Sequence, residues 1–437
     1  MDKDSKDVLT QIFSAAVAAA DPYIAVKNSL TLAPGLLKAG DVRYSLADIH
    51  NIYIVGAGKA AYGMARAAED VLGALVKEGA VVTKDGHGGR LKQVLVYEAS
   101  HPVPDLRGLE AGDRMLKIAE GAGEGDLVIA LLSGGASSLM VQPLPGISLG
   151  DKQEATRLML SSGADIAEVN CVRKHLSAIK GGRLALAAAP ARVLALIISD
   201  VPGDDLGVIA SGPTAPDETT FIQAAEILKM RGVYDRMPEA VRAALSEGGA
   251  GLLPETPKPD DKVFEGVHNV IVGSNRASLS KAAEVAGYMG FAVLTLEAPV
   301  TGEAKEVAAR LSKDVIAAHE TGTPKCLLFG GETTVTVKGA GRGGRNQEMA
   351  LAFALGVDGA RQCSALFAGT DGADGPTDAA GAFVDGETAQ RARESGLDPV
   401  SFLADNDSNR FFEVLGDLFV TGPTGTNVMD LGIILIR

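Results

Sequence analysis

The amino-acid sequence predicts an α/β protein built from two Rossmann-like α/β/α domains with a cleft between them. Short apolar runs end repeatedly in turns of glycine and small polar residues, each turn leads into a stretch that can be helical, and a proline-rich segment divides the chain. Runs rich in Val, Ile and Leu are typical of parallel strands that are covered on both faces. The six runs, with their turns, are 52–59, 127–138, 193–205, 270–275, 327–333 and 366–374.

The first half of the chain predicts alternating strands and helices. The strand that begins at Ile52 leads into a helix near 60–76, and 80–83 forms a second strand. Asp105 opens a further helix that runs toward Glu120, and its side chain is placed to cap that helix.

A proline-rich polar segment, PETPKPDD at 254–261, has the composition of a linker between domains. It predicts a first domain over 1–253 and a second over 262–437, in which the alternation resumes at Val270. Open α/β sheets bind ligands at the carboxyl ends of their strands, and glycine lets backbone N–H groups approach an anion closely. The turns therefore predict a cleft lined with anion-binding backbone.

Composition excludes several classes of function. The chain has 437 residues, 46% of them hydrophobic, which is enough for large cores. Its formal net charge of -14 argues against nucleic acid or an anionic membrane surface as a partner. No run approaches the roughly 18 apolar residues of a membrane span, and no secretory signal is recognisable. Three scattered cysteines fit a reducing compartment, so we expect a cytoplasmic protein; its oligomeric state stays open.

The first turn carries Gly56, Gly58 and Lys59. It satisfies the loose dinucleotide fingerprint G-x-G-x-x-G/A, and Asp85 lies at about the distance of a ribose-binding acid, which favours an NAD-dependent enzyme. Lys59, however, stands at a helix start, where the dipole disfavours a cation. We expect it to hold an anion, and the alternative is a solvated surface lysine.

Two more turns of the first half carry polar groups that suit ligand binding. Asp200 follows a hydrophobic strand directly, in the position of a metal ligand or of an acceptor for a hydroxyl proton, while Asp204 and Asp205 are read as turn formers. His101 could face the cleft, but a lone histidine beside prolines is more often a hydrogen-bonding loop residue. The other turn predicts a cradle for carboxylate or phosphate, with ordinary helix capping as the alternative; its candidate residues are Ser133, Gly134, Gly135, Ser137 and Ser138.

In the second half, Arg345 stands among glycines just before a predicted helix. Arginine recognises phosphate and carboxylate through two parallel hydrogen bonds, so this segment predicts a phosphate site, with a flexible surface loop as the alternative. The acidic loop 370–378 lacks the spacing of a calcium loop and suits Mg²⁺ or hydroxyl binding, or simple turn formation. The further binding candidates of this half are Glu332, Asn346, Asp371, Asp374, Thr424 and Asn427.

Taken together, these segments resemble the class II glycerate kinases, also called glycerate 2-kinases, with a C-terminal MOFRL domain. The resemblance covers nearly the whole chain and keeps the expected order. It rests on GAGKA at 56–60, LSGGASS at 132–138, SDVPGD at 199–204, GGET at 330–333, GGRNQE at 343–348, TDGADG at 370–375 and GPTGTN at 422–427.

The resemblance implies transfer of the ATP γ-phosphoryl group to the 2-hydroxyl of glycerate, with ATP and Mg²⁺ as cofactors and with glycerate and ATP as ligands. It places the family's essential lysine and arginine on Lys59 and Arg345; Asp200 remains the candidate that orients Mg²⁺ or takes the hydroxyl proton. Some members are labelled hydroxypyruvate reductases, so an NAD(P)H-dependent reductase stays an alternative, as does a non-catalytic regulator that binds a sugar acid. Which domain binds ATP stays open.

Overall fold

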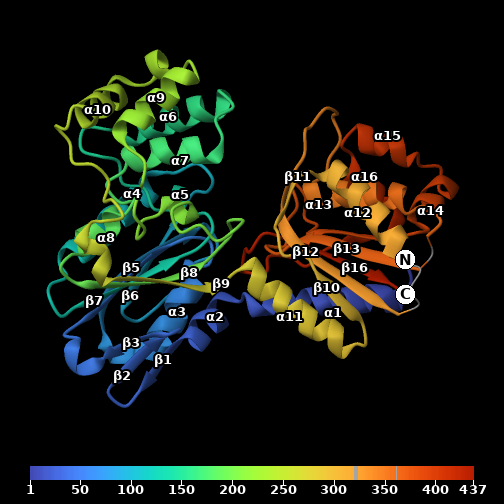
Figure 1. The fold of residues 1–437 in the computed structure, drawn as a ribbon, viewed down its shortest axis with the longest axis horizontal. Coiled ribbons are helices and arrows are strands. Elements are labelled where there is room, and N and C mark those ends of the chain that lie inside the picture. The colour runs from blue at the N-terminus through green and yellow to red at the C-terminus, as the bar shows by residue number, and fades with distance from the viewer. Residues whose placement is uncertain (319–322, 361) are drawn as a thin grey trace. The chain divides into compact units, whose positions relative to one another are not determined.

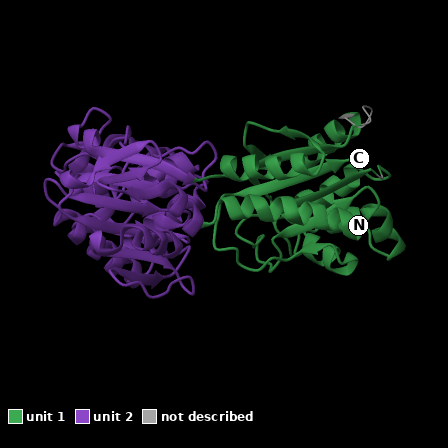
Figure 2. Cartoon of the chain, turned by 90° about the horizontal axis from the view of Figure 1, so that it is seen from below, with its two compact units in different colours: residues 1–21, 273–437 green, residues 22–272 purple. Residues whose placement is uncertain are grey.

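The computed structural model describes residues 1–318, 323–360 and 362–437 and divides into two compact units (Figures 1 and 2). One unit comprises residues 22–272 and is called the central unit here. The other combines residues 1–21 with residues 273–437 and is called the terminal unit.

The central unit is built around a six-stranded sheet in the order β6-β5-β4-β7-β8-β9. The pairs from β6 to β8 are parallel. In chain order this is 3-2-1-4-5-6, the Rossmann arrangement, so the strand order reverses between β4 and β7. The strands are β4 (Ile52–Ala57), β5 (Val76–Lys84), β6 (Val94–Ala99), β7 (Leu127–Leu132), β8 (Arg192–Ile198) and β9 (Val267–Gly273).

Helices cover both faces of this sheet, with α3 on one face and α4 and α8 on the other (Figure 1). Asp105 caps α4 by accepting hydrogen bonds from the backbone N–H groups of Arg107 and Gly108, both at 3.1 Å, as the sequence predicts. The helices around the sheet are α2 (Pro22–Ser29), α3 (Ala61–Leu72), α4 (Leu106–Glu120), α5 (Ala136–Leu139) and α8 (Arg183–Ala188).

Two smaller layers complete the central unit. Four helices share a hydrophobic cluster of their own: α6 (Leu149–Ser161), α7 (Ile166–His175), α9 (Phe221–Met230) and α10 (Glu239–Gly249). A separate antiparallel sheet consists of β1 (Leu30–Ala33), β2 (Leu36–Ala39) and β3 (Val42–Ser45).

The terminal unit contains a mixed sheet, which corrects the expectation of a second Rossmann-like domain. Its order is β10-β12-β16-β13-β14-β15, with β11 beside β12. The C-terminal strand β16 runs antiparallel to both of its neighbours, and β13 leads through a loop into antiparallel β14 instead of into a helix. The strands are β10 (Ala292–Thr295), β11 (Val300–Glu303), β12 (Lys325–Thr334), β13 (Cys363–Gly369), β14 (Gly381–Asp385), β15 (Leu418–Phe419) and β16 (Asp430–Ile436).

The expected α/β/α layering is nevertheless present in the terminal unit (Figure 1). Successive side chains of β16 point to opposite faces: Ile434 packs with α12 and α13, whereas Ile433 and Leu435 pack with α1 and α11. The helices are α1 (Lys3–Ala19), α11 (Asn275–Tyr288), α12 (Ala304–Ala318), α13 (Arg345–Gly356), α14 (Thr388–Glu394), α15 (Pro399–Ala404) and α16 (Ser408–Leu415).

The division of the chain differs from the expected one at both ends of the central unit. Helix α1 belongs to the terminal unit, where its apolar side chains, Phe13 among them, join the core formed by α11. The proline-rich segment belongs to the central unit, because Thr256 donates a hydrogen bond to buried Asp217 at 3.0 Å and Glu255 accepts one from the backbone of Phe221 at 2.8 Å. Strand β9 therefore completes the sheet of the central unit, and the chain passes into the terminal unit only at the end of β9.

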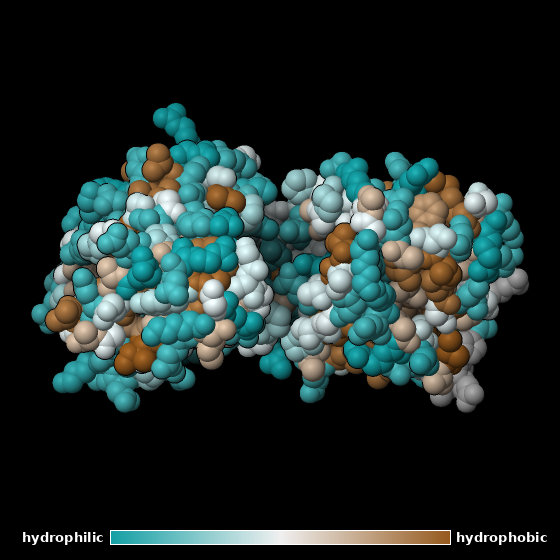
Figure 3. All heavy atoms as spheres, turned by 90° about the horizontal axis from the view of Figure 1, so that it is seen from above, coloured by the Kyte–Doolittle hydropathy of each residue, from teal (hydrophilic) through white to brown (hydrophobic). Residues whose placement is uncertain are grey.

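No described helix by itself is long and apolar enough to cross a bilayer; only α1 and α2 taken together, as a bent pair, meet those criteria by length and composition. On the face drawn in Figure 3, hydrophobic residues lie scattered among hydrophilic ones.

Candidate active site

The predicted turns of the central unit meet where its strand order reverses. The backbone N–H of Lys59, after β4, donates to the Gly134 carbonyl at 2.9 Å, and the N–H of Ala60 donates to Ser133 Oγ at 3.1 Å. The Asp200 carboxylate, after β8, lies against Gly134, where a Cβ atom would come within 2.3 Å of its Oδ2. Three turns far apart in sequence thus form one surface at the carboxyl edge of the sheet.

Close packing between β4 and β7 requires glycine at two of the predicted positions. Gly58 has a φ of +130°, and a Cβ atom there would lie 2.1 Å from Ser133 Oγ. A Cβ atom at Gly56 would lie 2.5 Å from the Leu131 carbonyl oxygen. These contacts explain both glycines without a nucleotide, so the fingerprint alone does not identify a dinucleotide site.

Asp85, the acid that a dinucleotide site would need to bind the ribose, already has a partner. Asp85 receives two hydrogen bonds from Arg107, at 2.5 and 2.9 Å, and this pairing lowers the pKa of the Asp85 carboxyl. A ribose hydroxyl would therefore have to compete with a bidentate ion pair.

The Lys59 side chain is half-buried beside His101 and Gly135. A Cβ atom at Gly135 would lie 3.5 Å from Lys59 Cγ and 3.0 Å from the His101 ring. Burial, followed by the positive charges of Lys59 and Lys84, lowers the pKa of His101 to about 4. His101 is therefore neutral at pH 7, and it lies in a loop beside Lys59.

A cavity of about 210 Å³ opens beside this surface. Ser137 and Ser138, two of the residues proposed from the sequence for an anion cradle, line it, and Ser137 Oγ lies 2.6 Å from Ser211 Oγ. Both serines lie within α5, which has only four residues, so its dipole adds less than expected. Two further cavity residues, Lys152 on α6 and Arg173 on α7, are not recognisable from the sequence, because nothing local distinguishes them from surface cations.

In the terminal unit, Arg345 begins α13 and is held by two carboxylates. Its guanidinium donates to both oxygens of Asp430, at 2.6 and 3.0 Å, and to Glu332 at 2.6 Å. Although burial opposes it, this pairing raises the pKa of Arg345. Glu332 at the end of β12 therefore orients the arginine, as does Asp430, which the sequence did not single out.

Asp374 and Asn346 fix the start of α13. The buried Asp374 carboxylate accepts hydrogen bonds from the backbone N–H groups of Asn346, at 3.1 Å, and Gln347, at 2.9 Å, and from both side-chain amides. Burial nevertheless raises the pKa of Asp374 to about 6. Asp374 thus caps the start of α13, the helix that Arg345 begins.

The other candidates of this unit stabilise the loops beside Arg345. Thr424 donates to the Thr370 carbonyl at 2.5 Å, and the Asn427 side chain accepts from the Met429 backbone at 3.2 Å. Asp371 accepts from the backbone N–H of Ala373 at 3.1 Å.

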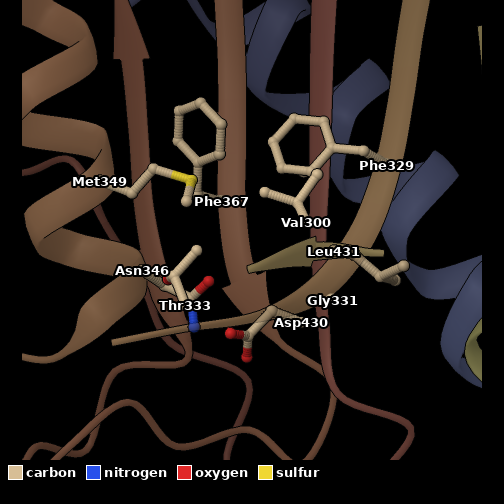
Figure 4. Close-up of a pocket in the computed structure, with 10 residues that line it drawn as sticks. Val300, Phe329, Gly331, Thr333, Asn346, Met349, Phe367, Asp430 and Leu431 are labelled. Atoms are coloured by element: carbon tan, nitrogen blue, oxygen red, sulfur yellow. The ribbon is translucent and has the colours of Figure 1, made fainter. Parts of the chain in front are cut away.

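Next to these loops lies a much smaller cavity of about 10 Å³ (Figure 4). Phe329 and Phe367 lie at one end, and Asn346, Thr333 and Asp430 at the other.

Across the described residues, no three His, Cys, Asp or Glu side chains gather in a cluster that could hold a metal ion. Mg²⁺ is commonly held by only one or two carboxylates together with substrate phosphates and water. Asp200, the carboxylate that contacts the turn after β7, fits that requirement.

Two family models match the chain. Residues 8–246 match a domain of unknown function, DUF4147, and residues 325–430 match the MOFRL family. The chain is 40% identical to a glycerate 2-kinase of Pyrococcus horikoshii over 99% of its own length and 98% of that protein, and 44% identical to a D-glycerate 2-kinase of Thermotoga maritima over 89% and 91%. A relative from Agrobacterium vitis, 42% identical over 100% and 95%, carries a hydroxypyruvate reductase name.

A solved structure agrees with these matches. The crystal structure of glycerate kinase from Thermotoga maritima is similar with a TM-score of 0.88 at 40% identity, and the similarity covers 100% of both chains. The chain belongs to the glycerate 2-kinase family, with a DUF4147 domain followed by a MOFRL domain.

Proposed function

We propose that this protein transfers the γ-phosphoryl group of ATP to the 2-hydroxyl of glycerate and so forms 2-phosphoglycerate. The two relatives named as glycerate 2-kinases, which match 99% and 89% of the chain, support this activity. One arrangement supports it most directly: Lys59 and Asp200 lie on adjoining turns at the reversal of the strand order, beside a cavity that contains further cations.

Phosphoryl transfer needs charge neutralisation and positioning more than covalent chemistry. In this proposal Lys59 neutralises the transferring group, and the Ser133–138 turn presents backbone N–H groups and hydroxyls to an anion. Asp200 either holds Mg²⁺ or accepts the proton of the attacking hydroxyl. When bound, Mg²⁺ would offset negative charge on the phosphates.

Arg345 is proposed to act on the same phosphoryl group. The three hydrogen bonds to Asp430 and Glu332 engage three of the five N–H donors of a guanidinium. The remaining donors suit a phosphoryl oxygen, and the two carboxylates hold the plane of the guanidinium in place.

The reductase alternative is less well supported. Hydride transfer to a keto acid favours a histidine partnered by a carboxylate, but the charges that shift the pKa of His101 belong to Lys59 and Lys84. The reductase name of the Agrobacterium relative keeps this activity as the second candidate. We also keep a cytoplasmic location as a proposal, because Cys171, Cys326 and Cys363 are all buried free thiols.

The two activities are separated by a pair of assays on the purified full-length chain. With glycerate, ATP and Mg²⁺ we expect ADP formation that depends on glycerate. With hydroxypyruvate and NADH or NADPH we expect no oxidation of the nucleotide. Nicotinamide oxidation without ADP formation would replace the kinase proposal with the reductase.

A further inference from the structure

The cavity of the central unit contains a buried cation without a partner. Lys152 is 5% exposed, lines the cavity, and its Nζ has no hydrogen-bond partner. A buried ammonium group that lacks both an ion pair and hydrogen bonds is costly to fold, so lysines are rarely buried in this way. Its position calls for a ligand that compensates the charge.

A second cation, Arg173, lines the same cavity. Lys180 lies outside the lining; it is fully buried, and its Nζ donates to the Ala210 carbonyl at 3.5 Å. Burial, then repulsion by Arg173, lowers the pKa of Lys152, whereas burial, then repulsion by Lys152 and Arg173, lowers the pKa of Lys180. None of the described residues that line the cavity is acidic.

A neighbouring buried lysine, Lys174, differs from Lys152 because it has a carboxylate partner. It follows Arg173 on α7 and is also buried, but its Nζ pairs with the fully buried Asp217 at 3.2 Å. The fold thus supplies a carboxylate to one buried lysine and leaves the cavity lysine without one.

We propose that Lys152 and Arg173, the two cations that line this cavity, bind the carboxylate of the acceptor acid, so that the central unit holds the hydroxy acid. The inference rests on the proposed function in one respect, which is the identity of that acid as glycerate. Ser137, Ser138 and Thr156 line the same cavity and can hydrogen-bond the hydroxyl groups of a short polyhydroxy acid.

A carboxylate fits this cavity better than the phosphates of ATP do. Nucleotide phosphates bind together with Mg²⁺, which takes at least one carboxylate from the protein in most such sites. The polar side chains of the described lining are two cations, three hydroxyls and the neutral His101 ring, whereas Asp200 is not part of the lining and lies against Gly134. An anion that arrives without a metal is the better match.

Two substitutions test the proposal, Lys152→Met and Arg173→Gln. Loss of one charge-assisted contact should weaken glycerate binding about 10- to 100-fold by calorimetry and raise the KM for glycerate similarly, with the KM for ATP unchanged. The matched control is Arg157→Gln, which removes an exposed cation of α6 that pairs with Glu154. It should change neither constant.

Thermal unfolding distinguishes a binding role from a structural one. Methionine nearly matches lysine in shape, so Lys152→Met should raise the Tm of the ligand-free protein at pH 6 by removing an uncompensated charge. Lys174→Met should lower the Tm, because it removes the charged partner of the buried Asp217 carboxylate. A lower Tm for Lys152→Met, with unchanged glycerate binding, would assign the lysine to structure alone.

Glycerate affinity should also depend on pH. Burial, then repulsion by Arg173, lowers the pKa of Lys152 to about 7, and His101, with a pKa near 4, stays neutral. Arg173 is the cation that shifts the pKa of Lys152, Lys180 is a further cation whose own pKa Lys152 lowers, and none of the described residues of the cavity lining is an acid. Because the anion binds the protonated form, the dissociation constant should rise toward about tenfold per pH unit above pH 7, and Lys152→Met should abolish that rise.

The arms of the binding experiment separate the possible ligands. Glycerate should bind without ATP, and more tightly than inorganic phosphate. If Lys152→Met and Arg173→Gln weaken ATP binding while glycerate binding is unaffected, the cavity is a phosphate site and the inference fails. If glycerate binds through Lys152 but is never phosphorylated, the kinase proposal fails while this inference stands.

Discussion

Lys59→Met should abolish most of the turnover and leave the fold intact. One preorganised charge contact to a transition state typically supplies about 2.7–4 kcal/mol, which corresponds to a loss of roughly 100- to 1000-fold in rate. The fold should survive because the turn is held by the backbone of Lys59, which bonds to Gly134 and to Thr83. Steady-state turnover with glycerate and ATP, together with thermal unfolding, measures both.

Lys117 offers the matched control, since it is an exposed lysine of α4 that pairs with Asp113. Lys117→Met should keep wild-type turnover. A folded Lys59→Met protein with near-normal turnover would remove Lys59 from the site.

Arg345→Lys should lower turnover by about 10- to 100-fold, because lysine keeps the charge and loses the planar set of donors. A primary ammonium group cannot pair with both oxygens of Asp430 and still present two further N–H groups in a fixed plane. We expect the loss mainly in kcat, since the contact to the phosphoryl group is proposed to strengthen in the transition state.

Arg345→Ala should change the stability of the fold as well as the chemistry of the site. Asp430 is 8% exposed, and removing its partner leaves a buried carboxylate unpaired, at a cost of about 1–3 kcal/mol in the free energy of unfolding. The lysine variant is therefore the informative one. Should both variants keep wild-type turnover and lose only nucleotide affinity, Arg345 would be a ground-state binding residue.

The parts of the site that follow strands directly are predictable from sequence. The turns at Lys59, Ser133 and Asp200 follow apolar runs, and parallel strands bring their carboxyl ends to one edge. Similarly, the Asp105 cap depends on neighbours two and three residues away.

Features that depend on distant contacts are not predictable in this way. The antiparallel insertion of β16 next to β12 is set by tertiary pairing, and it brings Asp430 to Arg345 from 85 residues away. Lys152 looks like any helical lysine until the packing of α6 against its neighbours removes it from water. The segment at 254–261 has the composition of a linker, but it belongs to the central unit, because Thr256 donates a hydrogen bond to Asp217 there.

The position of the new phosphate ester tests the central claim most directly. Phosphorus NMR of the product formed from glycerate and ATP should show coupling to one carbon-bound proton, that of C2, and enolase should consume the product without added mutase. Coupling to the two protons of C3, together with a requirement for phosphoglycerate mutase, would contradict phosphorylation of the 2-hydroxyl.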